Sequence, residues 1–173
     1  MSFLILVRHG QSIWNLEKRF TGWVDVGLTN KGEIEAEKAG LLIKEKKINI
    51  DYYYSSLQLR ANKTLKIIQT VLGHKKDFTK AWQLNERHYG ALTGLNKIEM
   101  NKKIGEDKVY EFRRSWDVKP EALDKNNPYH PINIETYKDM PKEIIPDTES
   151  LKDTYERVTK YYEEEIKNKL KDK

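Results

Sequence analysis

An apolar run that ends in Arg-His-Gly constrains this chain more than any other feature. Residues 4–7 read Leu-Ile-Leu-Val, and Arg8, His9 and Gly10 follow directly. A short run of branched residues cut off by a glycine is typical of a buried strand. In an open α/β sheet, ligands bind at the carboxyl edge of the strands. We therefore expect residues 4–7 to form a buried strand that delivers Arg8 and His9 to a binding site.

The residues at this predicted edge suit a phosphate group. Neutral imidazole is a nucleophile, and arginine offers a planar fork to phosphoryl oxygens. Gly10 lets the backbone approach a ligand closely, and Ser12 and Asn15 begin a predicted short helix whose amides are further donors. The hypothesis is that His9 accepts a phosphoryl group. On the Arg-His-Gly tripeptide alone, an ordinary hydrogen-bonding histidine remains an equal alternative.

Composition predicts one soluble domain over residues 1–173. The chain has no cysteine, which excludes disulfides and thiolate metal sites and fits a reducing cytoplasm. Its N-terminal apolar run, residues 3–7, is too short for a signal peptide core or a membrane span. The net charge is +5, but the lysines are scattered and no predicted helix gathers basic residues on one face, which disfavours nucleic-acid binding.

The remaining sequence alternates predicted strands and helices. Short aromatic or branched runs predict strands over residues 50–54 and 78–84. Apolar periodicity predicts helices near residues 12–18, 29–47, 57–72, 98–104, 106–115 and 150–172. The residues read as helix caps are Thr29, Ser55, Ser56, Gly73, Ser150 and Asp153. This alternation predicts a three-layer α/β fold with a mainly parallel central sheet flanked by helices.

Three further segments carry candidate binding residues. Arg60 falls in the first turn of a helix that follows a strand, where an anion can bind, although a surface arginine is the plain alternative. Residues 84–97 form a polar, aromatic, glycine-punctuated segment in which Glu86 is the only carboxylate. Glu86 is therefore the candidate for moving a substrate proton, with an ion pair to Arg87 as the alternative. Arg113 and Arg114 point about 100° apart on a helix and can grip two oxygens of an anion, unless they are a solvated surface pair.

Residues 120–146 contain all five prolines of the chain and show neither helical nor strand periodicity. Long loops of this kind inside compact domains usually line or cover a site. His130 lies within this loop, and its recruitment to catalysis is improbable.

Together these segments resemble a known family. The residues that carry the resemblance are Arg8-His9-Gly10-Gln11-Ser12, Trp14-Asn15, Phe20-Thr21-Gly22-Trp23 and the segment 84–97. They are similar to the cofactor-dependent phosphoglycerate mutases of the histidine phosphatase superfamily. The resemblance implies a cytoplasmic enzyme of glycolysis and gluconeogenesis that interconverts 3-phosphoglycerate and 2-phosphoglycerate through a phosphohistidine. It also implies priming by 2,3-bisphosphoglycerate and no metal, and it leaves a homodimer or a homotetramer open.

The same resemblance implies roles for individual residues. His9 would carry the phosphoryl group and Glu86 would donate and accept the substrate proton. The phosphate-binding residues would be Arg8, Ser12, Asn15 and Arg60. The substrate-binding residues would be Thr21, Gly22, Tyr89, Lys97, Arg113 and Arg114. His88 belongs to the motif without a catalytic role, so we expect it to be structural.

The sequence departs from the family pattern after the helix predicted at 150–172. In the family, another apolar strand follows there and brings a second His-Gly-Asn to the phosphate site, and these 173 residues contain none. We therefore expect a truncated protein or a piece of a longer chain, impaired on its own by on the order of a hundredfold or more. We also expect sheet edges and apolar faces to be left uncovered.

Two rival functions remain open from the sequence. One is a phosphatase of the same superfamily, in which water takes the phosphoryl group from His9. The substrate-binding set at Tyr89, Lys97, Arg113 and Arg114 favours a small doubly anionic substrate and so disfavours simple hydrolysis. The other rival is a truncated, non-catalytic homologue that binds phosphorylated ligands, which the absent second histidine favours.

Overall fold

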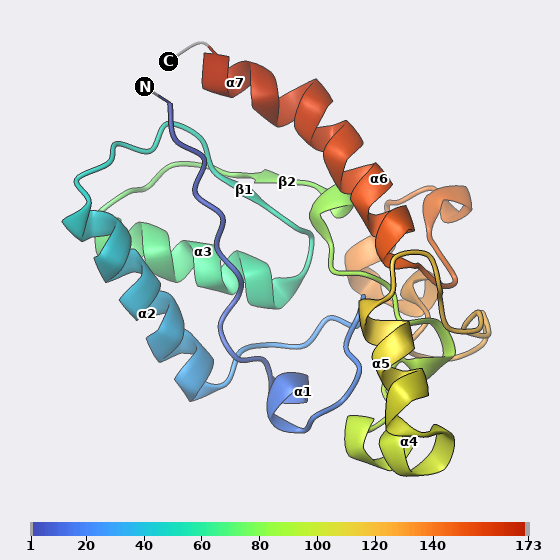
Figure 1. Ribbon diagram of the computed structural model, residues 1–173. Helices are drawn as coiled ribbons and strands as arrows, with labels where there is room; N and C mark the ends of the chain where they lie inside the picture. The colour runs from blue at the N-terminus through green and yellow to red at the C-terminus, as the bar shows by residue number, and fades with distance from the viewer. Residues whose placement is uncertain (1, 172–173) are drawn as a thin grey trace.

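The computed structural model describes residues 2–171 and has an α/β architecture (Figure 1). Strand β1 (Tyr54–Ser55) pairs in parallel with β2 (Thr79–Lys80), with Tyr54 opposite Thr79 and Ser55 opposite Lys80. Helix α3 (Leu59–Leu72) makes the crossover between the two strands. The other helices are α1 (Ile13–Leu16), α2 (Asn30–Glu45), α4 (Lys97–Ile104), α5 (Glu106–Arg114), α6 (Leu151–Tyr161) and α7 (Lys167–Lys171). The predicted α/β class is confirmed, with a smaller sheet than expected.

The predicted N-terminal strand is wrong. Residues 4–7 run as an extended segment without strand pairing, and the side chain of Leu6 is 85% exposed. Within residues 2–171, no backbone group of residues 3–7 has a hydrogen-bonding partner. A strand exists only when a neighbour pairs with it, so an apolar run that suits a strand stays extended and unpaired here. The segment passes in front of β1 and leads down to α1 (Figure 1).

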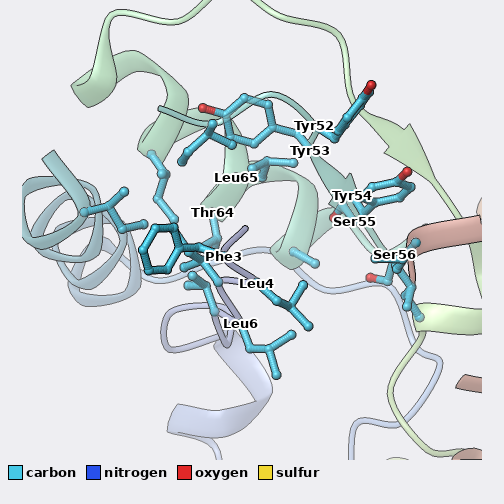
Figure 2. A pocket seen from close by; sticks show the side chains of 18 of the residues that line it. Phe3, Leu4, Leu6, Tyr52, Tyr53, Tyr54, Ser55, Ser56, Thr64 and Leu65 are labelled. Carbon is cyan, nitrogen blue, oxygen red and sulfur yellow. The ribbon is translucent and has the colours of Figure 1, made fainter. Parts of the chain in front are cut away.

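A cavity of about 900 Å³ separates this segment from β1. Figure 2 shows Phe3, Leu4 and Leu6 on one side of it, Tyr52–Ser56 on the other, and Thr64 and Leu65 of α3 between them. Arg8, His9, Gln58 and Glu86 also line the cavity. The apolar side chains of this cavity are therefore uncovered, as predicted. The cavity extends to the candidate site.

The helix ends follow local chemistry. Thr29 caps α2 by accepting a hydrogen bond from the Gly32 amide, and Gly73 ends α3 in the left-handed region at a φ of +73°. Both caps confirm the predictions. The predicted cap at Ser55 and Ser56 is wrong, because the N-cap of α3 is Gln58, which makes no side-chain cap bond.

Helix α6 begins at the predicted capping box. The Ser150 hydroxyl accepts from the Asp153 amide, and the Asp153 carboxylate accepts from the Ser150 amide. After α6, a π-helical segment (Tyr162–Ile166) connects to α7, so the predicted C-terminal helix is continuous through residue 171. The predicted helices at 98–104 and 106–115 also correspond closely to α4 and α5.

Two buried clusters hold the loop that follows α1. Phe20 packs with Leu92, Met100 and Val109. Trp23 packs with Tyr137 and Ile145 of the proline-containing segment, and the Tyr137 hydroxyl donates to the Trp23 carbonyl at 2.6 Å. That segment has short 3-10 turns (Pro131–Asn133, Glu135–Tyr137 and Lys142–Ile144), and two more (Trp82–Leu84 and Gly90–Leu92) lie in the preceding part of the chain. The contacts of the proline-containing segment with Trp23 hold residues 20–23 beside the candidate site.

No helix among residues 2–171 combines the length and the apolar character that crossing a membrane would require.

Candidate active site

His9 is partly buried at the mouth of the cavity, with a defined ring orientation. Its Nδ1 lies 2.7 Å from the carbonyl oxygen of Gly10. A carbonyl oxygen can only accept, so Nδ1 carries the hydrogen and Nε2 keeps its lone pair in the neutral ring. Burial lowers the pKa of His9 below its ordinary value, and the charges of Arg60 and Arg8 act in the same direction. The geometry therefore presents a neutral imidazole whose Nε2 is the nucleophilic atom.

Gly10 is required for a different close approach from the one predicted. A Cβ at Gly10 would lie 2.0 Å from the carbonyl oxygen of Gly32 in α2. The Gly10 amide donates to the hydroxyl of Thr64 in α3 at 3.2 Å. Because it has no side chain, Gly10 can pack against both α2 and α3. This packing restrains the backbone next to His9.

Arg60 joins the histidine to the candidate proton carrier. Its side chain is fully buried, although the sequence left a surface arginine open. Its Nε donates to Nε2 of His9 at 3.3 Å, and one terminal nitrogen donates to a carboxylate oxygen of Glu86 at 2.9 Å. Its terminal nitrogens also donate to the carbonyls of Gly22 and Val24. Because the carbonyls of Gly22 and Val24 hold the guanidinium that contacts both side chains, Arg60 restricts the separation of His9 and Glu86.

Glu86 faces the cavity, with its carboxylate 35% exposed. The predicted alternative, an ion pair with Arg87, is absent from the described part of the chain, where Arg87 instead donates to the Phe112 carbonyl. The Glu86 amide donates to the side-chain oxygen of Gln58 at 3.3 Å, while the nitrogen of the same side chain donates to the Gly22 carbonyl at 2.8 Å. Gln58 therefore fixes the Glu86 segment relative to Gly22.

Lys97 lies within electrostatic range of three other charged side chains, of which Arg8 and Glu86 line the cavity. Burial lowers the pKa of Lys97 below its ordinary value, and the positive charges of Arg113 and Arg8 lower it further, whereas the charge of Glu86 opposes them. Arg113, Arg8 and Glu86 are therefore each close enough to Lys97 to act on its charge. Three cations around one carboxylate make a region suited to an anion with more than one charge.

Thr21, Gly22 and Tyr89 form the side of the site next to Phe20. The Tyr89 ring packs on Phe20 with 5.3 Å between ring centres, and a Cβ at Gly22 would meet the Tyr89 amide at 3.2 Å. The buried hydroxyl of Thr21 has no hydrogen-bond partner among the residues that the structure describes. A buried unpaired hydroxyl is costly, so it is a natural contact for a bound polar group.

Three predicted site residues are less directly placed. Ser12 and Asn15 form a capping box in which the amide of each donates to the side chain of the other, both at 3.2 Å. This pairing shapes the turn after His9, and their contact with a phosphoryl group remains a prediction. Arg114 is exposed at the end of α5, so its contact with a substrate also remains a prediction.

The contacts of His88 and His130 fit the predictions of a structural His88 and a His130 outside catalysis, and both roles remain predictions. Both are fully buried, and Nδ1 of His88 accepts from the Gly90 amide while Nε2 of His130 pairs with Asp147 at 2.9 Å. Among residues 2–171, His, Cys, Asp and Glu form no cluster that could hold a metal ion.

The sequence analysis missed two residues that build this site. Gln58 is buried and joins two loops, and Arg157 of α6 donates to the backbone of the Glu86 segment. The only local indication that Gln58 has a structural role was its place as a polar residue between apolar residues of the predicted helix. For Arg157, the signal was the choice of arginine in a helix otherwise rich in lysine.

Comparison with known proteins assigns the family. A family model described as "Histidine phosphatase superfamily (branch 1)" matches residues 4–173. A "2,3-bisphosphoglycerate-dependent phosphoglycerate mutase" of Pelagibacter ubique (strain HTCC1062) is 71% identical over 171 residues, which are 99% of this chain and 72% of the relative. A protein of the same description from Borreliella burgdorferi (strain ZS7) is 54% identical over 94% of this chain, which spans only 66% of that relative.

Solved structures support the fold. "Mycobacterial hydrolase 1" matches with a TM-score of 0.64 and 18% identity, covering 92% of this chain and 64% of its own. A "putative alpha-ribazole-5'-P phosphatase" from Escherichia coli matches with a TM-score of 0.63 and 15% identity, covering 91% and 63%. At these identities the likeness concerns the fold alone. From the family model and the close relatives, the chain belongs to the histidine phosphatase superfamily and, within it, to the family of the 2,3-bisphosphoglycerate-dependent phosphoglycerate mutases.

Proposed function

We propose that this protein is a phosphoglycerate mutase that interconverts 3-phosphoglycerate and 2-phosphoglycerate through a phosphoryl group carried on His9. The observation that carries the proposal is the arrangement of His9, Arg60 and Glu86. One guanidinium contacts both the nucleophilic nitrogen at 3.3 Å and the carboxylate at 2.9 Å. A nucleophile and a proton carrier on either side of a phosphate-binding group are the parts that phosphoryl transfer to and from a hydroxyl needs.

In the proposed transfer, the phosphoryl group moves between Nε2 of His9 and a substrate hydroxyl. When His9 gives up its phosphoryl group, the bond between Nε2 and phosphorus breaks as a substrate hydroxyl oxygen bonds to phosphorus. The hydroxyl proton passes to the Glu86 carboxylate, which returns it to the leaving oxygen when the other phosphoryl group moves to His9. Arg60 and Arg8 stabilise the charge that develops on the transferring oxygens. The lowered pKa of His9 keeps the ring neutral and ready to accept again.

The cations beyond Glu86 support a substrate with two anionic ends. The charges of Arg113 and Glu86 both act on Lys97, and the buried hydroxyl of Thr21, which has no partner among residues 2–171, lies on the loop after α1. We propose that these residues hold the carboxylate and second phosphate of the glycerate, with Gly22 and Tyr89 shaping the pocket and Arg114 at its rim. This set also fits 2,3-bisphosphoglycerate, which when bound would supply the phosphoryl group that primes His9.

The cavity beside His9 supports the expectation of one more strand. Among residues 2–171, the backbone of residues 3–7 is unpaired on one side of the cavity, and β2 is the one strand that pairs with β1 on the other. The relatives are longer than the match, since the chain spans 72% of the Pelagibacter protein. We propose that the part of such longer proteins outside the match places an apolar strand in this cavity and thereby brings the second histidine to the site.

We further propose that the protein acts in the cytoplasm on free phosphorylated glycerates, without nucleic acid or a membrane. The absence of cysteine is compatible with that compartment. Assembly as a homodimer or a homotetramer stays a prediction.

The function is tested by incubating the protein with 3-phosphoglycerate and catalytic 2,3-bisphosphoglycerate and following 2-phosphoglycerate. We expect interconversion that depends on 2,3-bisphosphoglycerate, at a low rate for the 173-residue chain alone. Release of inorganic phosphate without 2-phosphoglycerate would support the phosphatase rival. Binding of 3-phosphoglycerate without either product would support the non-catalytic rival.

A further inference from the structure

Arg157 of α6 holds the backbone of the segment that carries Glu86. The guanidinium donates to the carbonyl oxygens of Gln83 at 2.6 Å, Asn85 at 2.9 Å and Glu86 at 3.1 Å. The Arg157 side chain is only 9% exposed, so water does not compete effectively for these carbonyls. A residue 71 positions away in sequence thus fixes the main chain on both sides of the Glu86 peptide unit.

The orientation of Arg157 is itself fixed by Glu149. The two carboxylate oxygens of Glu149 accept from Nε at 2.6 Å and from a terminal nitrogen at 3.0 Å, and the Glu149 side chain is 5% exposed. The same carboxylate accepts from the His88 amide at 2.9 Å, and the Glu149 amide donates to the His88 carbonyl at 3.1 Å. Glu149 and Arg157 together therefore hold the backbone of the segment 83–88 at four of its residues, Gln83, Asn85, Glu86 and His88.

The contacts on Glu86 come from three independent groups. Arg157 holds its carbonyl, Gln58 accepts from its amide and Arg60 binds its carboxylate. With the amide and the carbonyl both held, the direction in which the side chain leaves the backbone is set before a substrate binds. A carboxylate that moves a proton in a transition state loses rate steeply when it is misplaced, by about a hundredfold for 1 Å.

We propose that Arg157, fixed by Glu149, is a positioning residue for proton transfer by Glu86. The proposal rests on the proposed role of Glu86 and adds a group that lies outside the cavity and touches no reacting atom. Lysine cannot replace Arg157, because an ammonium group cannot reach three carbonyls and a bidentate carboxylate from one side chain. The effect should fall on the transfer step and spare binding, since the proposed substrate-binding cations Lys97 and Arg113 come from α4 and α5.

The test is single-turnover phosphorylation of His9 by 2,3-bisphosphoglycerate, with the Kd for the same compound measured on each variant. We expect Arg157→Lys to slow phosphorylation at least about tenfold while the Kd changes less than about twofold. Lys160→Met, at an exposed position of the same helix, is the matched control and should match the parent protein. Glu149→Gln weakens the same clamp without altering Arg157, so it replaces Arg157→Lys should that variant fail to fold.

A Glu86→Gln background separates positioning from general loosening. There, Arg157→Lys should slow the residual transfer by less than about twofold, because the group it positions no longer moves a proton. An equal loss in both backgrounds, or a parent-like rate in Arg157→Lys and Glu149→Gln, would overturn the inference while leaving the proposed function intact. A parent-like rate in Glu86→Gln itself, or no phosphorylation of the parent protein, would instead refute the proposed function and the inference with it.

Discussion

Arg60 donates to Nε2 of His9, the same imidazole nitrogen that is proposed to carry the phosphoryl group. The contact is long for a hydrogen bond, at 3.3 Å, whereas the bond from Arg60 to Glu86 is 2.9 Å. A phosphoryl group on Nε2 would offer oxygens to the same guanidinium, which can exchange a weak contact for a charge-assisted one. Arg60 is therefore placed to bind the resting site loosely and the charged group tightly.

Replacing Arg60 should harm both chemistry and stability. Arg60→Lys keeps the charge but loses the fork, so we expect phosphorylation of His9 to fall by about a hundredfold or more. The free energy of unfolding should fall by about 2–3 kcal/mol, because the carbonyls of Gly22 and Val24 lose their buried donors. Single-turnover kinetics and urea denaturation measure the two effects. Lys66→Met, exposed on the same helix, should change neither, and a parent-like rate in Arg60→Lys would contradict the assignment.

Thr21 offers a test in which binding and stability change independently. Its buried hydroxyl has no partner within residues 2–171, so Thr21→Val should leave the free energy of unfolding within about 0.5 kcal/mol or raise it slightly. Binding of 3-phosphoglycerate should weaken by about tenfold, because the substrate would lose a charge-assisted hydrogen bond. Calorimetric titration and thermal unfolding give the two numbers. An unchanged Kd would remove Thr21 from the substrate-binding set.

Acid should destabilise the fold through His88. Burial lowers the pKa of His88 to about 3, and the neighbouring His130 acts in the same direction. The folded state therefore binds fewer protons than the unfolded state between the ordinary histidine pKa, about 6.5, and pH 3. The contribution of a neutral His88 is complete above about pH 6.5 and is lost as the pH falls, by on the order of several kcal/mol.

The variant His88→Asn isolates this contribution. An asparagine oxygen can accept from the Gly90 amide as Nδ1 of His88 does, but it does not titrate in this range. Denaturant unfolding from pH 7 to pH 4 should give a flatter stability curve for the variant than for the parent protein. Parallel curves would mean that His88 is not buried as a neutral ring.

Three helix ends could be predicted from sequence because their determinants are local, whereas the predicted cap of α3 at Ser55 and Ser56 was wrong. Thr29 contacts Gly32, and Ser150 contacts Asp153, so each cap is complete within one turn. Gly73 likewise needs only its own left-handed backbone. His9, Arg60 and Glu86 were predicted as site residues because the first two follow predicted strands and the third lies in a polar segment, and the structure brings the three together.

The features that could not be predicted from sequence depend on contacts between distant segments of the chain. Whether residues 4–7 form a strand is decided by a pairing neighbour, which no local pattern contains. The role of Gln58 depends on Glu86, 28 positions away, and that of Arg157 on a segment more than 70 positions away. The burial of Arg60 likewise follows from carbonyls of the loop at residues 22–24, which its own helical turn does not reveal.

The N-terminal segment is apolar but exposed, so we expect that truncating one of its side chains has little effect on stability. Leu6 is 85% exposed, so Leu6→Ala should lower the free energy of unfolding of this chain by less than about 0.5 kcal/mol. Leu92→Ala, in the buried cluster with Phe20, is the matched substitution and should cost about 2–5 kcal/mol. A cost above about 2 kcal/mol for Leu6→Ala would mean that the segment is packed and the cavity filled.

The central claim is that His9 accepts a phosphoryl group. The most direct measurement is the intact mass of the protein before and after incubation with 2,3-bisphosphoglycerate, on the parent protein, His9→Ala and the control His74→Ala. The account predicts one added, acid-labile phosphoryl group on the parent and the control, and none on His9→Ala. Phosphoryl uptake by His9→Ala, or none by the parent protein, would contradict it.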